Sequence, residues 1–147
     1  MENTTIKQRV LDLFNGADER NWEKVKMAFA ENVLLDYSSL SGNPASVQPS
    51  VQIIDAWKSF LPGFDRTHHQ LSDFTIQDND GHATATFKGK ADHFIGNDSW
   101  TVEGRYHADL KNLHGSWFIT MLKFELEKQS GNNQLPGMAV QNVREKK

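Results

Sequence analysis

Cysteine is absent from this sequence of 147 residues. Without thiols the chain forms no disulfide bond, offers no thiolate ligand to a metal and has no cysteine nucleophile. The sequence also lacks any apolar run near the ~20 residues that a membrane-spanning helix needs. Its first residues, MENTTIKQRV, contain no apolar segment of the kind that marks a secretory signal. We therefore expect a cytoplasmic protein that makes no membrane contact.

An excess of charge of one sign is missing as well. The 16 Lys and Arg residues are scattered among 19 Asp and Glu residues, so the net charge is −3 and no basic surface for nucleic acid is expected. The histidines show neither H-x-H nor H-x-x-x-H spacing, and we expect no metal site and no cofactor. Any chemistry has to come from side chains such as His, Asp and Tyr.

Helical periodicity is present in the first part of the chain. Apolar residues recur at helical spacing over residues 6–17, and Asn21 is a candidate cap for a second helix. Pro49 suits the first turn of a third helix. This third helix is expected to bury one face, formed by Val51, Ile54, Trp57 and Leu61.

The rest of the chain is strand-like. A first strand is expected near residues 33–38, and four further runs are separated by the turn signals DNDG, GNDS and NLHGS. Helices first and an antiparallel meander second favour an α+β fold over alternating βαβ units. We predict a single domain over residues 1–128. Residues 129–147 are predicted to be a C-terminal tail, partly ordered or flexible, with Leu135, Met138 and Val140 as its apolar anchors.

Strand alternation assigns several polar side chains to the interior. Over residues 83–93 the apolar face includes His93, and over residues 100–110 it includes Tyr106. The same alternation turns Tyr37 inward on the first strand. Small residues on the apolar face, such as Ala91, leave volume unfilled and favour a ligand cavity over a tightly packed core.

Alternation does not choose between the neighbouring histidines His68 and His69, because both faces of their strand carry apolar residues. Asp18 lies one turn beyond Phe14, on the buried side of the first helix. A carboxylate in that position needs a partner, which an inward histidine would supply. The alternative interpretation of Asp18 is a cap for the next helix.

The motifs ADERNW, VLLDYSSL, THHQLSDF and GSWFITMLKFEL, in this order, resemble the SnoaL-like branch of the NTF2-like superfamily. Within that branch they are most similar to the scytalone dehydratases. The resemblance covers roughly residues 5–127. It implies a cystatin-like α+β fold, a cone-shaped barrel in which N-terminal helices pack in a curved, mostly antiparallel sheet around a deep pocket.

The resemblance also selects site residues. Asp18 matches the catalytic aspartate of the dehydratases, and His69 matches their catalytic histidine. Tyr37 and His93 match pocket residues that contact substrate. A tyrosine that precedes the aspartate in those enzymes is replaced here by Ala17. Further candidate substrate contacts are Tyr106, which with Gly104 takes the place of a serine and an asparagine, and Trp57.

This set predicts a lyase or isomerase without a cofactor. His69, held by Asp18, would remove a proton next to a carbonyl group of a small hydrophobic compound. The alternative is a SnoaL-like protein that binds a small molecule without turnover, which the changes at Ala17 and Gly104 favour. The resemblance further implies a homodimer or homotrimer formed through the sheet.

Overall fold

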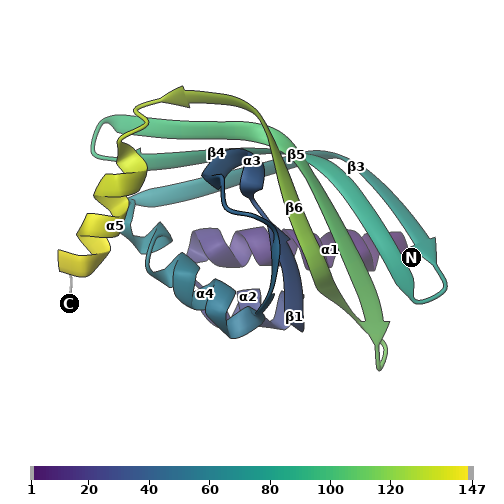
Figure 1. Cartoon of the computed structure of the whole chain (residues 1–147). Helices are drawn as coiled ribbons and strands as arrows, with labels where there is room; N and C mark the ends of the chain where they lie inside the picture. The colour runs from purple at the N-terminus through teal and green to yellow at the C-terminus, as the bar shows by residue number, and fades with distance from the viewer. Residues whose placement is uncertain (1, 146–147) are drawn as a thin grey trace.

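The computed structural model describes residues 2–145 of the chain. A curved six-stranded sheet wraps around the first helix (Figure 1). The helical elements are α1 (Glu2–Glu19), α2 (Trp22–Ala28), α3 (Ser38–Ser41), α4 (Ser50–Lys58), the 3-10 turn η1 (Leu61–Gly63) and α5 (Leu135–Glu145). The strands are β1 (Phe29–Asp36), β2 (Ser46–Pro49), β3 (Arg66–Asn79), β4 (His82–Ile95), β5 (Asp98–Leu113) and β6 (Ser116–Gly131).

The sheet is curved and open. Its strand order is β2-β1-β6-β5-β4-β3, so that β2 and β3 form the two edges. The β1–β6 pair is parallel and all other neighbours are antiparallel. The long strands β3 to β6 follow one another through tight turns, as the turn signals predicted. At the first of these turns Asp80 and Gly81 both have positive φ, which the DNDG sequence accommodates.

The core lies between α1 and the concave face of the sheet. Ile6, Val10 and Leu13 on α1 are fully buried. The predicted alternation of β4 and β5 is confirmed, because Ala85, Phe87, His93, Trp100, Val102, Tyr106, Ala108 and Leu110 are all buried. The small and large side chains of these two strands thus define the inner surface that faces the helix.

The capping prediction at the second helix is also confirmed. The side chain of Asn21 accepts a hydrogen bond from the backbone N–H of Lys24 at 3.2 Å. The predicted face of the third helix is partly wrong. Val51 is 52% exposed, whereas Ile53 is fully buried beside Ile54. Helix α4 contacts the core through these two isoleucines and Trp57, and Ser50 in its first turn is buried as well. The predicted residue Leu61 is buried but lies beyond the helix, in η1.

The segment after residue 128 contains regular structure. β6 continues to Gly131, and α5 then packs against η1 and the ends of β4 and β5 (Figure 1). Leu135 and Ala139 are fully buried, while the predicted anchor Met138 is 42% exposed. Among residues 2–145, no helix combines the length and apolar composition needed to cross a bilayer.

Candidate active site

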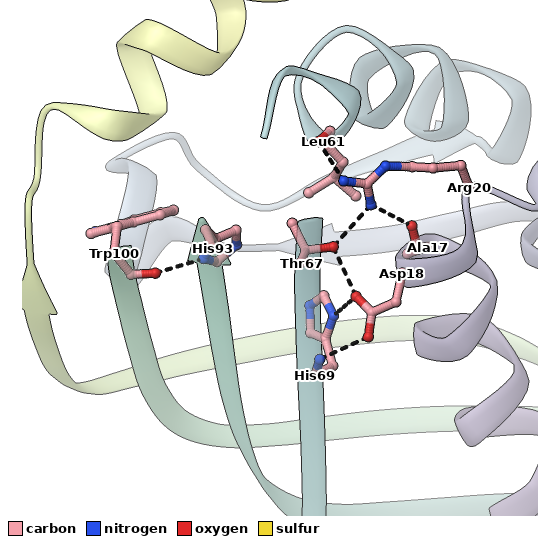
Figure 2. A network of polar contacts seen from close by, with 8 residues as sticks. All are labelled: Ala17, Asp18, Arg20, Leu61, Thr67, His69, His93 and Trp100. Carbon is pink, nitrogen blue, oxygen red and sulfur yellow. Dashed lines mark hydrogen bonds and ion pairs between the residues drawn. The ribbon is translucent and has the colours of Figure 1, made fainter. Parts of the chain in front are cut away.

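Asp18 and His69 form a hydrogen-bonded pair at the end of α1 (Figure 2). The Nδ1 atom of His69 lies 2.7 Å from Oδ1 of Asp18, and the backbone N–H of His69 donates to Oδ2 at 2.7 Å. Because a carboxylate only accepts, Nδ1 of the neutral imidazole carries the proton. The Nε2 lone pair of His69 is therefore left for a group in the adjoining cavity. Asp18 is not the cap of α2, since Asn21 has that role.

Thr67 and Arg20 complete the surroundings of the carboxylate. The hydroxyl of Thr67, which is buried, donates to Oδ1 of Asp18 at 2.9 Å. The Arg20 guanidinium donates to Oγ1 of Thr67 at 2.9 Å, to the carbonyl of Ala17 at 2.8 Å and to the carbonyl of Leu61 at 2.8 Å. Sequence reasoning did not select either residue.

These contacts decide the charge of Asp18. Burial alone would raise the pKa of the Asp18 carboxyl, but the hydrogen bonds and charge of His69 and the hydroxyl of Thr67 lower it more. The net effect is a pKa below the ordinary value of 3.8. Asp18 is therefore ionised near neutral pH and can hold the His69 ring in one tautomer.

His93 lies beside His69, on the neighbouring strand β4, with ring centroids 6.4 Å apart. Its Nδ1 atom lies 3.0 Å from the backbone carbonyl oxygen of Trp100, so Nδ1 carries the proton here as well (Figure 2). Burial lowers the pKa of His93 to about 4, although the bond to the carbonyl of Trp100 opposes this effect. At neutral pH His93 is uncharged, and its Nε2 atom can accept a hydrogen bond from a ligand.

Tyr37 and Tyr106 supply hydroxyl groups to the same space. Their rings lie 6.5 Å apart, and their side chains share a hydrogen bond. Burial raises the pKa of both tyrosines, so both hydroxyls stay protonated. One O–H proton is used in the bond between the two residues. The other can be donated to an oxygen atom of a ligand.

These groups surround a cavity of about 250 Å³ with a mostly apolar wall. The volume lies below the ~300–1,000 Å³ that is typical for sites of drug-sized ligands, which indicates a small ligand. The lining residues are Phe14, Ala17, Leu35, Tyr37, Leu40, Trp57, Phe60, Leu61, His69, Ala91, His93, Trp100, Val102, Tyr106 and Phe124.

The structure brings the predicted residues together. Tyr37, Trp57, His69, His93 and Tyr106 all line the cavity, and Asp18 lies behind His69. His68 is exposed on the outer face of β3, opposite Asp92 of β4.

Thr67 could have been found once the resemblance had selected His69, because it lies two residues earlier on the same strand and therefore on the same face. Arg20 gave no such signal. In the part of the chain that the structure describes, no group of three or more acidic, His or Cys side chains is placed to hold a metal ion.

Fold and site together define a class of protein: an α+β domain in which a curved sheet and a helix enclose an apolar cavity with an Asp–His pair at its side. The chain belongs to the family of SnoaL-like domains, whose model matches residues 2–123. The NTF2-like, cystatin-like fold implied by the sequence resemblance is thereby confirmed. Among curated proteins, none matches the sequence.

Several solved structures share this fold. Kfla4162 from Kribbella flavida is 19% identical with a TM-score of 0.85, over 93% of this chain and 95% of that chain. A candidate scytalone dehydratase from Novosphingobium aromaticivorans is 16% identical with a TM-score of 0.76, over 90% of this chain and 88% of that one. A type 2 hexachlorocyclohexane dehydrochlorinase, LinA, is 11% identical with a TM-score of 0.73, over 89% and 88% of the two chains. At these identities the likeness shows the fold alone.

Proposed function

We propose that this protein is a cofactor-independent lyase or isomerase for a small hydrophobic carbonyl compound, with the Asp18–His69 pair as its general base. The observation that carries the proposal is the bond of 2.7 Å between Asp18 Oδ1 and His69 Nδ1 at the wall of an apolar cavity. The family and its solved neighbours, which include a candidate dehydratase and a dehydrochlorinase, support a reaction of the lyase type.

The proposed reaction begins at the α-carbon of the carbonyl compound. Nε2 of His69 takes the α-proton, and the electron pair of the C–H bond moves toward the carbonyl oxygen. Asp18 stabilises the imidazolium that forms. The free hydroxyl of the Tyr37–Tyr106 pair donates a hydrogen bond to the enolate oxygen, where negative charge develops, and keeps its proton.

The second step depends on the substrate. In a dehydration, the bond from the β-carbon to its hydroxyl breaks, a C=C bond forms, and the proton held by His69 leaves with the hydroxyl group as water. In an isomerisation, the same proton returns to a different carbon atom. Nε2 of His93 accepts from the departing hydroxyl before the bond breaks. The neutral tautomer of His93 offers no proton to a carbonyl oxygen, so contact with the leaving group is the role that its Nε2 atom can have.

The alternative function is binding of a small hydrophobic molecule without turnover. Its support is the wall of the cavity, where Ala17 stands in place of the tyrosine that the dehydratases have before their aspartate. Such a protein would keep the cavity and would use the Asp18–His69 pair only as a hydrogen-bonding element.

A panel of cyclic β-hydroxy ketones and β,γ-unsaturated ketones separates these functions. We expect turnover of at least one member by the wild-type protein, and a loss of 100-fold or more, at the low end for a general base, in His69→Gln and Asp18→Asn. His68→Gln is the matched control, since its side chain is exposed and lies on the other face of the same strand. Equal rates in His69→Gln and wild type would exclude the proposed base.

A further inference from the structure

We propose that Arg20 is a positioning residue for the Asp18–His69 pair and that it acts through the hydroxyl of Thr67. The same guanidinium also holds the wall of the cavity at Leu61. The inference rests on the proposed function only in treating the Asp18–His69 pair as a general base. The contacts themselves require no substrate.

Arg20 reaches the site because the chain turns sharply after α1. Helix α1 ends at Glu19, and Arg20 has a φ of 59°, in the left-handed region. This conformation is unfavourable for a residue with a side chain. It allows the partly buried guanidinium to donate to the helix carbonyl of Ala17, to Thr67 and to Leu61 (Figure 2). Three hydrogen bonds made by a charged donor can offset the backbone cost.

The contact with Thr67 fixes the direction of a hydroxyl proton. A guanidinium has donors only, so the Oγ1 atom of Thr67 must accept from Arg20. The single hydroxyl proton of Thr67 is then left for Oδ1 of Asp18, which lies 2.9 Å away. Without the guanidinium this hydroxyl could rotate and leave Asp18 Oδ1 with one donor fewer.

The orientation of Asp18 in turn sets the orientation of His69. Oδ1 of Asp18 accepts hydrogen bonds from the hydroxyl of Thr67 and from the ring N–H of His69, while Oδ2 accepts one from the backbone N–H of His69. Three donors from a single strand hold the plane of the carboxylate. Nη2 of Arg20 also donates to the carbonyl of Leu61, which lines the cavity, so the base and the cavity wall are held by one cation.

The test is the tautomer of His69, measured by ¹⁵N NMR of the imidazole nitrogens near pH 8 in the full chain. Wild-type His69 is expected to be the Nδ1–H form. Arg20→Met keeps the aliphatic stem but removes every donor, and we expect the Nε2–H fraction to rise at least tenfold. Arg66→Met is the matched control. Arg66 is an exposed residue of β3, the strand of Thr67 and His69, and its guanidinium stacks on the ring of Phe94. It should leave the His69 signals unchanged.

Variants of Thr67 test the path of the effect. Thr67→Val should reproduce the tautomer change of Arg20→Met, whereas Thr67→Ser, which keeps the hydroxyl, should retain the wild-type tautomer. Arg20→Met combined with Thr67→Val should show no larger change than either variant alone. An unchanged tautomer in Arg20→Met, or a double variant in which the two effects add, would overturn the inference. If Arg20→Met does not fold, Thr67→Val decides in its place, and wild-type His69 signals in Thr67→Val would reject the role.

Failure of the inference can be told apart from failure of the proposed function. If Arg20→Met changes the His69 tautomer but no carbonyl compound is turned over, the proposed function fails and the inference stands. Arg20 is then the positioning residue of a binding site. Turnover that requires His69 but is unaffected by Arg20→Met would retain the lyase or isomerase and reject the role of Arg20.

Discussion

At the scale of single residues, His93 gives the site a specific dependence on pH. Its imidazole is buried and bonded to the carbonyl of Trp100, and its pKa in the folded protein lies near 4 instead of the ordinary 6.5. The unfolded chain binds this proton at a higher pH than the folded protein does. The contribution of neutral His93 to stability is therefore complete above about pH 6.5 and declines toward pH 4.

We predict that the free energy of unfolding falls by roughly 3 kcal/mol from this group between pH 7 and pH 4. Urea denaturation at several pH values measures the slope. His93→Phe should flatten it in this window, and His68→Gln, a change at an exposed residue, should not. The same slope in His93→Phe and wild type would contradict the assignment. Protonation of Asp18 also lowers the free energy of unfolding, but it does so at lower pH, because the pKa of Asp18 in the folded protein lies below 3.8.

The residues of the site differ in how far the sequence could predict them. Strand alternation alone placed His93 and Tyr106 inside, because their neighbours form an uninterrupted apolar face. It left His68 and His69 open, and only the family resemblance chose His69. The partner of that histidine lies 51 positions away in the chain. Such pairings depend on how α1 crosses β3, which local periodicity does not encode. The position of the Arg20 side chain depends on a left-handed backbone conformation that the neighbouring residues do not predict.

At the scale of secondary-structure elements, the packing of α5 against η1 determines one wall of the cavity. A Cβ atom at Gly63 would lie 1.8 Å from the backbone carbonyl oxygen of Ala139. Asn142 donates to the carbonyl of Gly63 at 3.0 Å, and Leu135 is fully buried nearby. Only glycine allows this approach of helix and turn. Because η1 also carries Leu61, the position of α5 affects the cavity.

Gly63→Ala is predicted to displace α5 and to lower the free energy of unfolding by about 2 kcal/mol or more, as in other overpacked sites. Hydrogen–deuterium exchange should accelerate over residues 135–145. Gly137→Ala is the control within the helix, since a Cβ there meets nothing within 4 Å. It should stabilise α5 by up to about 1 kcal/mol through helix propensity. Unchanged exchange in Gly63→Ala would show that α5 does not depend on this contact.

The helices and strands could be predicted from the sequence where the spacing of their apolar residues is regular over many positions. The long strands β3 to β6 alternate over many residues, and the turn signals between them are strong. β2 has four residues, all on an exposed edge, and its pairing with β1 is what makes it a strand. α5 was treated as part of a tail because its buried residues, Leu135 and Ala139, are few and lie among glycine and polar residues.

At the scale of the whole molecule, we propose that the outer face of the sheet joins two or three copies of the chain. Val47, Leu34 and Met121 lie side by side on strands β2, β1 and β6, and Val47 and Leu34 are 69% and 40% exposed. An exposed apolar row of this kind favours association. Light scattering after gel filtration should give the mass of a dimer or trimer, which Val47→Lys with Leu34→Lys reduces to 16.7 kDa. Met27→Lys, on α2, is the control. A monomeric wild type would reject the proposal.

The central claim is that His69, held by Asp18, removes a proton next to a carbonyl group inside the cavity. It is tested most directly by incorporation of deuterium from D₂O into the α-position of small cyclic ketones, because this step needs no leaving group. We predict incorporation by the wild-type protein and by His68→Gln, with a loss of 100-fold or more in His69→Gln and Asp18→Asn. Incorporation at equal rates in His69→Gln and wild type, or none above the buffer rate in wild type, would contradict the account.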